Sequence, residues 1–160
     1  MKITSEQEML KFGKEYGRAI AAMCSTEHED LARAARSVSG GHAAAIALPL
    51  LIELIGDVGA GKTTFVRGLA EGLGIKEPIT SPSFTISKTY ALPGGKTLVH
   101  YDFYRLKDPG LMAEDLEENL NNPNNIVVVE WADSVTNLLP KNHVKIEISY
   151  NDDETREVKL

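Results

Sequence analysis

Residues 56–63 read Gly-Asp-Val-Gly-Ala-Gly-Lys-Thr, and their types and spacing point to phosphate chemistry. Two glycines separated by four residues and followed by Lys62 and Thr63 match a phosphate-binding loop. Glycines let the backbone take positive φ and turn N–H groups toward an anion, while the lysine and threonine serve the phosphates and Mg²⁺. The residues that we expect to surround the phosphates are Gly56, Asp57, Gly59, Ala60, Gly61, Lys62, Thr63 and Thr64.

The flanking sequence has the elements that such a loop needs. Residues 50–55 form a short apolar run of strand length, and residues 64–73 have the apolar spacing of a helix that Gly74 would end. The alternative is a chance glycine-rich loop, which would lack a strand before it and a helix after it. The context favours a phosphate site between a buried strand and a helix.

A second acidic candidate follows a fully apolar run. Residues 126–129 read Ile-Val-Val-Val, which is typical of a central strand buried on both faces. Glu130 comes directly after this run. In a chain with a phosphate loop, an acidic residue there is a candidate Mg²⁺ ligand or water-positioning group.

Two further segments have two interpretations each. Residues 78–83 place two prolines around hydroxyl residues, so they form either a tight loop or a segment that senses the γ-phosphate and Mg²⁺ through Thr80 or Ser81. Residues 84–90 and 97–104 predict a hairpin. His100 and Asp102 lie on one face of its second strand, and with Arg105 they form either a functional group or a surface salt-bridge cluster.

The remaining segments predict three helices and two strands. A capping box at Ser5 starts a helix to about Ala22, and a second one at Thr26 starts a helix that ends at Gly40-Gly41. Residues 107–125 contain a short helix. Residues 144–150 alternate as a strand does, and residues 151–160 continue as a peripheral strand.

Composition sets limits on the class of protein. The chain has 160 residues, a net charge of −6 and one cysteine, which suits a single cytoplasmic domain without a disulfide. The negative charge disfavours direct binding of nucleic acid or anionic membrane. The guanine-binding pattern Asn-Lys-x-Asp is absent from the sequence, so adenine is the expected base.

Four segments together resemble one family. They are residues 56–68, residues 80–85 (Thr-Ser-Pro-Ser-Phe-Thr), residues 100–106 (His-Tyr-Asp-Phe-Tyr-Arg-Leu) and residues 129–131 (Val-Glu-Trp). In this order they are similar to the TsaE family, small bacterial P-loop ATPases of tRNA threonylcarbamoyladenosine synthesis. The resemblance extends from about Leu50 to Tyr150.

The resemblance implies a fold and a set of site residues. The fold would be α/β, a three-layer P-loop NTPase-like domain over 1–160, with a mixed parallel and antiparallel sheet flanked by helices. ATP and Mg²⁺ would be its cofactors. The metal ligands would be Thr63 and Glu130, the residues for hydrolysis Glu130, Asp102 and Thr80, and the adenine contacts Glu6 and Arg156.

The resemblance also implies partners and a role. The family's partners are TsaB and TsaD, which modify adenosine 37 of tRNA, so ATP hydrolysis would act on that complex and tRNA would be reached through it. The ATPase would be weak without these partners. The stretch between Gly13 and Gly56 is longer than is typical of the family, which suggests a helical insertion near residues 24–45. The alternative function is a small-molecule phosphotransferase, a kinase with the same loop.

Overall fold

The computed structural model describes residues 1–25, 50–151 and 155–160, so the helix expected from Thr26 and most of the expected insertion lie outside the described residues. The described strands form one sheet in the order β1-β7-β6-β2-β5-β4-β3. The strands are β1 (Lys2–Ile3), β2 (Leu50–Ile55), β3 (Ser87–Ala91), β4 (Thr97–Asp102), β5 (Asn125–Glu130), β6 (Val144–Tyr150) and β7 (Arg156–Lys159). The helices are α1 (Glu6–Ser25), α3 (Lys62–Leu73) and α4 (Leu111–Asn121), with short 3-10 turns η1 (Pro93–Gly95) and η2 (Ala132–Leu138).

The middle of the sheet is parallel and its edges are antiparallel. Strand β2 pairs in parallel with β5 and β6, and β4 pairs in parallel with β5. Strands β1, β7 and β3 join through antiparallel pairs. The carboxyl ends of β2, β4 and β5 therefore share one edge, which is where open α/β sheets bind ligands. The mixed sheet confirms the expected fold class.

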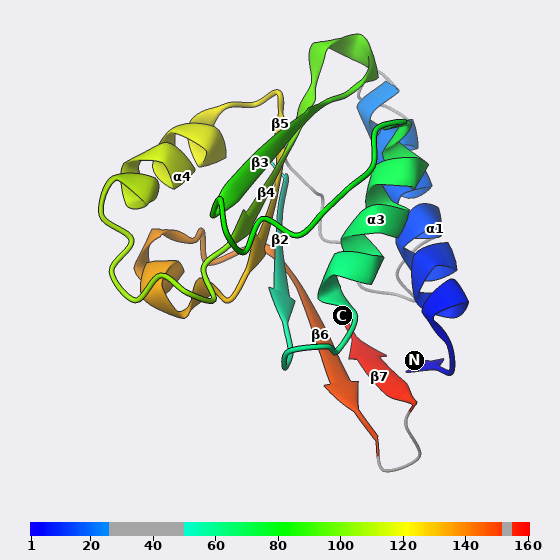
Figure 1. Cartoon of the computed structure of the whole chain (residues 1–160). Coiled ribbons are helices and arrows are strands. Elements are labelled where there is room, and N and C mark those ends of the chain that lie inside the picture. The colour runs from blue at the N-terminus through cyan, green and yellow to red at the C-terminus, as the bar shows by residue number, and fades with distance from the viewer. Residues whose placement is uncertain (26–49, 152–154) are drawn as a thin grey trace.

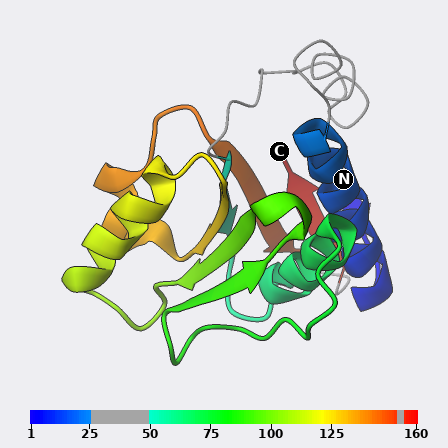
Figure 2. The same cartoon turned by 90° about the horizontal axis from the view of Figure 1, so that it is seen from above.

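Helices cover both faces of the sheet, giving three layers (Figure 1). Helices α1 and α3 lie side by side on one face, and α4 with η2 lies on the other, as Figure 2 also shows. Alternate residues of β2 divide between two buried clusters, with Ile52 and Leu54 facing α3 and Leu51 facing α4. This period of two is what a strand buried on both faces requires.

Helices α1 and α3 approach each other through four glycines. A Cβ at Gly68 would lie 2.2 Å from the Leu10 carbonyl oxygen, and one at Gly17 would lie 2.2 Å from the Leu69 carbonyl oxygen. Gly13 and Gly72 are packed in the same way against the facing backbone. Because only hydrogen fits at these positions, the backbones of the two helices are in direct contact.

The N-terminus of α1 shows the expected cap in a modified form. The Ser5 hydroxyl accepts a hydrogen bond from the Glu8 N–H at 3.2 Å, as an N-cap should. Glu8 reaches back one residue further than in a capping box, to the N–H and the hydroxyl of Thr4. These bonds lower the pKa of the exposed Glu8 carboxyl. The helix runs to Ser25, beyond the expected end at Ala22.

The first strand of the expected hairpin is shorter than its sequence suggests. Residues 84–86 are not in β3, because the Pro82 carbonyl accepts hydrogen bonds from the N–H groups of Thr85 and Ile86 and closes a turn. Ile86 takes a left-handed conformation with φ 68°. The second strand ends at Asp102 rather than Tyr104, whose N–H bonds to the Asp102 carboxylate instead of a neighbouring strand.

Candidate functional site

The loop between β2 and α3 has the backbone of an anion site. Gly59 and Gly61 have φ of 81° and 109°, which side chains other than glycine rarely adopt. Gly61 precedes α3 in this left-handed conformation, and no side chain caps the helix. The first N–H groups of a helix need partners, so an uncapped N-terminus with its positive dipole end suits a phosphate.

Lys62 is held inside the loop by two backbone carbonyl groups. Its Nζ donates hydrogen bonds to the carbonyl oxygens of Gly56 and Asp57, at 2.7 Å and 3.0 Å, and lies 4.3 Å from the centre of the Trp131 ring. Burial lowers the pKa of Lys62, while the nearby carboxylates, Glu130 first, oppose this shift. A desolvated ammonium next to two carbonyls gains from an anionic partner, so phosphate oxygens are suitable replacements for those carbonyls.

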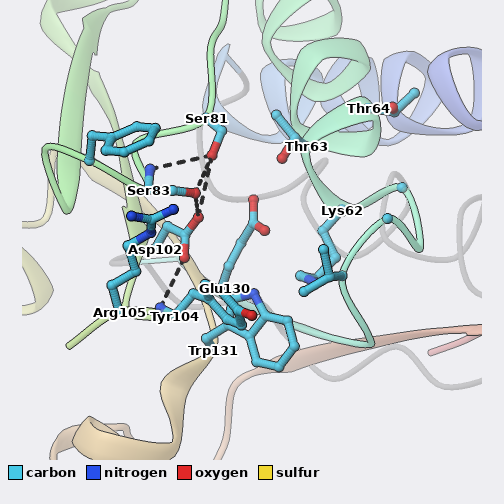
Figure 3. A pocket seen from close by; sticks show the side chains of 14 residues that line it. Lys62, Thr63, Thr64, Ser81, Ser83, Asp102, Tyr104, Arg105, Glu130 and Trp131 are labelled. Atoms are coloured by element: carbon cyan, nitrogen blue, oxygen red, sulfur yellow. Dashed lines mark hydrogen bonds between the residues drawn. The ribbon is translucent and has the colours of Figure 1, made fainter. Parts of the chain in front are cut away.

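Two carboxylates lie opposite the loop. Asp102 ends β4 and Glu130 ends β5, and the two residues are directly paired across the parallel strands. Both face the α3 side of the sheet, since the alternating residues Leu98 and Val128 belong to that cluster. In Figure 3 their side chains extend into the space facing Lys62 and Thr63. The sheet register therefore brings together acidic residues 28 positions apart in the chain.

A cluster of hydroxyl groups, Ser81 and Ser83, holds the Asp102 carboxylate (Figure 3). The Ser83 and Ser81 hydroxyls both contact Asp102 Oδ2, the latter at 3.3 Å, and also contact each other. The backbone N–H of Tyr104 donates to Asp102 Oδ1 at 3.0 Å. We call this arrangement of Ser81, Ser83 and Asp102 the hydroxyl latch. It ties residues 81–83 to the end of β4.

These groups line one open pocket of about 420 Å³. It contains most of the expected site residues: Gly59, Gly61, Lys62, Thr63, Thr64, Asp102 and Glu130. Gly56, Asp57 and Ala60 belong to the loop but do not line the pocket. The Gly56 and Asp57 carbonyls contact Lys62, and Ala60 is buried.

The oxygen donors of the pocket suit Mg²⁺. Thr63 offers a hydroxyl, and Glu130 and Asp102 offer carboxylates, the hard ligands that Mg²⁺ takes. Within the described ranges, no group of three or more His, Cys, Asp or Glu side chains is arranged to hold a metal by itself.

Three further expected site residues, which lie outside the loop, do not line the pocket either. Thr80 accepts a hydrogen bond from the Lys88 ammonium, and Glu6 pairs with Arg67 at 2.7 Å. Arg156 donates to the Ala60 carbonyl oxygen at 3.0 Å and lies over the Tyr150 ring, so it touches the phosphate loop from β7. The roles of Thr80, Glu6 and Arg156 stay predictions.

Several pocket residues were not expected as site residues from the sequence: Trp131, Tyr104, Phe84 and Ser83. Arg105, which the sequence analysis grouped with His100 and Asp102, also lines the pocket. Arg105 stacks over Phe84 at 4.5 Å and makes no bond to Asp102, so the salt-bridge interpretation of that segment was wrong. The sequence signal that could have identified these residues is proximity in the chain, because each lies within three residues of Asp102, Glu130 or Ser81.

Comparison with known proteins decides the family. A family model described as "Threonylcarbamoyl adenosine biosynthesis protein TsaE" matches residues 3–158. The chain belongs to the TsaE family. The family's description places TsaE proteins in threonylcarbamoyladenosine biosynthesis, and the resemblance stated from the sequence is confirmed.

Individual TsaE relatives support the assignment. The Haemophilus influenzae tRNA threonylcarbamoyladenosine biosynthesis protein TsaE is 31% identical over 155 residues, covering 94% of this chain and 82% of that protein. Bacillus subtilis TsaE is 42% identical over 109 residues, covering 68% of this chain and 66% of that protein. The crystal structure of Bacillus subtilis YdiB superposes with a TM-score of 0.65 and 28% identity, covering 99% of this chain and 80% of that chain.

The residues that match the TsaE family model include the phosphate loop and the strands β4 and β5, which end at Asp102 and Glu130.

None of the described helices is long and apolar enough to cross a membrane.

Proposed function

We propose that this protein binds and hydrolyses ATP as the nucleotide-driven component of the machinery that forms threonylcarbamoyladenosine at position 37 of tRNA. One observation carries the proposal: Lys62, Thr63 and Glu130 line the same pocket at the carboxyl edge of the parallel strands. A phosphate-binding loop facing an acidic strand end is the arrangement that phosphoryl-transfer sites share.

Each side chain has a separate task in this proposal. Lys62 leaves the Gly56 and Asp57 carbonyls and binds the β- and γ-phosphates, which offsets the desolvation of its ammonium. Thr63 and Glu130 would hold a Mg²⁺ ion, which would supply positive charge to the phosphate oxygens. Asp102 orients the attacking water once the Ser81 and Ser83 hydroxyls release its Oδ2. Hydrolysis thus requires the hydroxyl latch to open.

The proposed partners are TsaB and TsaD, with tRNA reached through them. The net charge of −6 opposes the many phosphate contacts that tRNA binding needs. The side chains at the mouth of the pocket include Phe84, which is 84% exposed, and Tyr104, which is 53% exposed. Exposed aromatic groups at a site are suited to protein contacts. A slow ATPase that a partner completes at this mouth fits these features.

A phosphate-release assay tests the proposal. We expect slow ATP hydrolysis by the protein alone and faster hydrolysis after addition of TsaB, TsaD and tRNA. Glu130→Gln, which keeps the shape but removes the charge, should keep ATP binding and lower turnover by about 100-fold. Phosphate transferred to a small-molecule acceptor instead of water would favour the phosphotransferase, and unchanged turnover of the variant would remove Glu130 from the mechanism.

A further inference from the structure

A buried imidazole lies directly behind the pocket. His100 Nε2 is 2.8 Å from Glu130 Oε1, and the two side chains are 0% and 3% exposed. His100 does not line the pocket, whereas Glu130 does. The imidazole therefore touches the acidic residue from the protein side, where neither solvent nor a ligand reaches it.

The surroundings of the two ring nitrogens of His100 indicate which of them carries the hydrogen. A carboxylate is an acceptor only, so Nε2 of His100 carries a hydrogen and donates it to Glu130. Nδ1 is buried and has no hydrogen-bond partner among the described residues. A second proton on Nδ1 would leave a buried donor unsatisfied, which is costlier than an unshared lone pair. These contacts favour the Nε2–H form of the ring with no proton on Nδ1.

Glu130 has far fewer restraints than the neighbouring carboxylate. Asp102 accepts from Ser81, Ser83 and the Tyr104 N–H. Among the described residues, the Glu130 carboxylate has a single hydrogen bond, which comes from His100. In addition, the Glu130 and Lys62 charges attract each other. Loss of the imidazole donor would free Glu130 to turn toward Lys62, away from its place opposite Thr63.

We propose that His100 is a positioning residue for Glu130. It holds Oε1 through Nε2–H, so that Oε2 is directed to the metal side of the pocket opposite Thr63. This inference rests on the proposed ATP and Mg²⁺ site and adds to it the residue that orients its carboxylate. Replacing a residue that holds a metal ligand from behind typically lowers metal affinity or activity by about 10- to 100-fold.

Two substitutions separate the hydrogen bond from the bulk of the side chain. In His100→Gln the amide nitrogen takes the place of Nε2 and keeps the donor, whereas in His100→Asn it takes the place of Nδ1 and does not reach Glu130. We measure ATP affinity by equilibrium titration with Mg²⁺ and with EDTA. We expect the increase in ATP affinity that Mg²⁺ gives to be about tenfold smaller in His100→Asn than in the wild-type protein. In His100→Gln this increase should stay within about threefold of wild type. The ATP affinity in EDTA should be unchanged in both variants.

A measurement on the ligand-free wild-type protein tests the same bond without nucleotide. A long-range proton–nitrogen correlation spectrum of the imidazole rings identifies the tautomer, and the signals missing from His100→Gln assign His100 among the four histidines. We expect the neutral Nε2–H form. An Nδ1–H ring, or equal losses in the two variants, would overturn the proposal. If Mg²⁺ gave the wild-type protein no gain in ATP affinity, the proposed function would fail, while the spectrum would still decide whether His100 donates to Glu130.

Discussion

The two walls of the pocket, the phosphate-loop side and the Asp102 side, are held in place by different kinds of contact. On one side, α3 carries the phosphate loop and meets α1 with backbone against backbone, because Gly13, Gly17, Gly68 and Gly72 leave no side chain between them. On the other side, residues 81–83 are tied to Asp102 by side-chain hydroxyls. Direct backbone contact leaves no alternative arrangement of similar energy, whereas hydroxyl bonds are exchanged readily for bonds to water or phosphate.

Backbone strain falls on the second wall. Among the described residues, the non-glycine positions with positive φ are Ile86 and Trp131, at 68° and 57°. Ile86 follows the hydroxyl latch, and Trp131 follows Glu130 directly. Such conformations cost on the order of 1–3 kcal/mol each and concentrate at switch segments. From this difference we predict that the phosphate-loop side is the fixed wall and the Asp102 side the moving wall.

The largest effect should come from filling the helix contact. Gly68→Ala places a Cβ 2.2 Å from the Leu10 carbonyl oxygen, so α1 and α3 must separate. We expect a loss of about 3 kcal/mol or more in the free energy of unfolding, measured by urea denaturation. Glu15→Ala, at an exposed position of α1, is the control and should stay within about 0.5 kcal/mol. Equal stability of the two variants would mean that the helices are not in fixed contact.

Lys62→Ala removes the cation that stands between the two walls. Its Nζ bonds to Gly56 and Asp57 are replaced readily by water, so the fold should remain. Loss of the charge-assisted bonds to phosphate should weaken MgATP binding by about 100-fold in an equilibrium titration. Retained affinity would show that nucleotide phosphates bind elsewhere.

Ser83→Ala opens the hydroxyl latch without touching the loop. One partly exposed hydrogen bond is worth about 1 kcal/mol, so global stability should fall by no more than this. Amide hydrogen exchange should rise in residues 81–86 and stay unchanged in α3, because α3 does not depend on the latch. Faster exchange across the phosphate loop as well would show that the two walls are coupled in the ligand-free protein.

The smallest change in stability should follow Glu6→Gln. Glu6 pairs with Arg67 in an ion pair whose side chains are 63% and 42% exposed, and such pairs contribute less than about 1 kcal/mol. A fall in the preference for ATP over GTP, by about fivefold, is expected if Glu6 contacts adenine as the family resemblance implies. Thermal unfolding and competition titration measure the two effects separately, and unchanged selectivity would remove Glu6 from the base site.

The sequence predicted the fixed wall better than the moving one. The loop, β2, α3 and the central strand β5 were predicted because each depends on a local pattern that a short window contains. Ser83 was not predicted as a partner of Asp102, since a contact between residues on different elements leaves no local pattern. His100 was assigned the correct strand face, but its burial against Glu130 depends on the pairing of β4 with β5.

The glycine contact between α1 and α3 has a signal in the sequence. Gly13 and Gly17 are four residues apart in one expected helix, and Gly68 and Gly72 are four apart in the other. Glycines at this spacing lie on one helix face and allow two helices to approach closely. Pairing the two helices required knowing that both lie on the same side of the sheet, which only the topology supplies.

Because their backbones are in direct contact, we expect α1 and α3 to move together as one rigid unit. With 12 residues, α3 is about 18 Å long. Tilting α3 by about 5° about its phosphate-loop end would therefore move its C-terminal end by about 1.5 Å. Gly74 and Cys24 lie toward that opposite end, on the side of a separate pocket lined by Leu92 and Pro93. We therefore expect any tilt of α3 at its phosphate-loop end to reach that opposite end without side-chain rearrangement between the two helices.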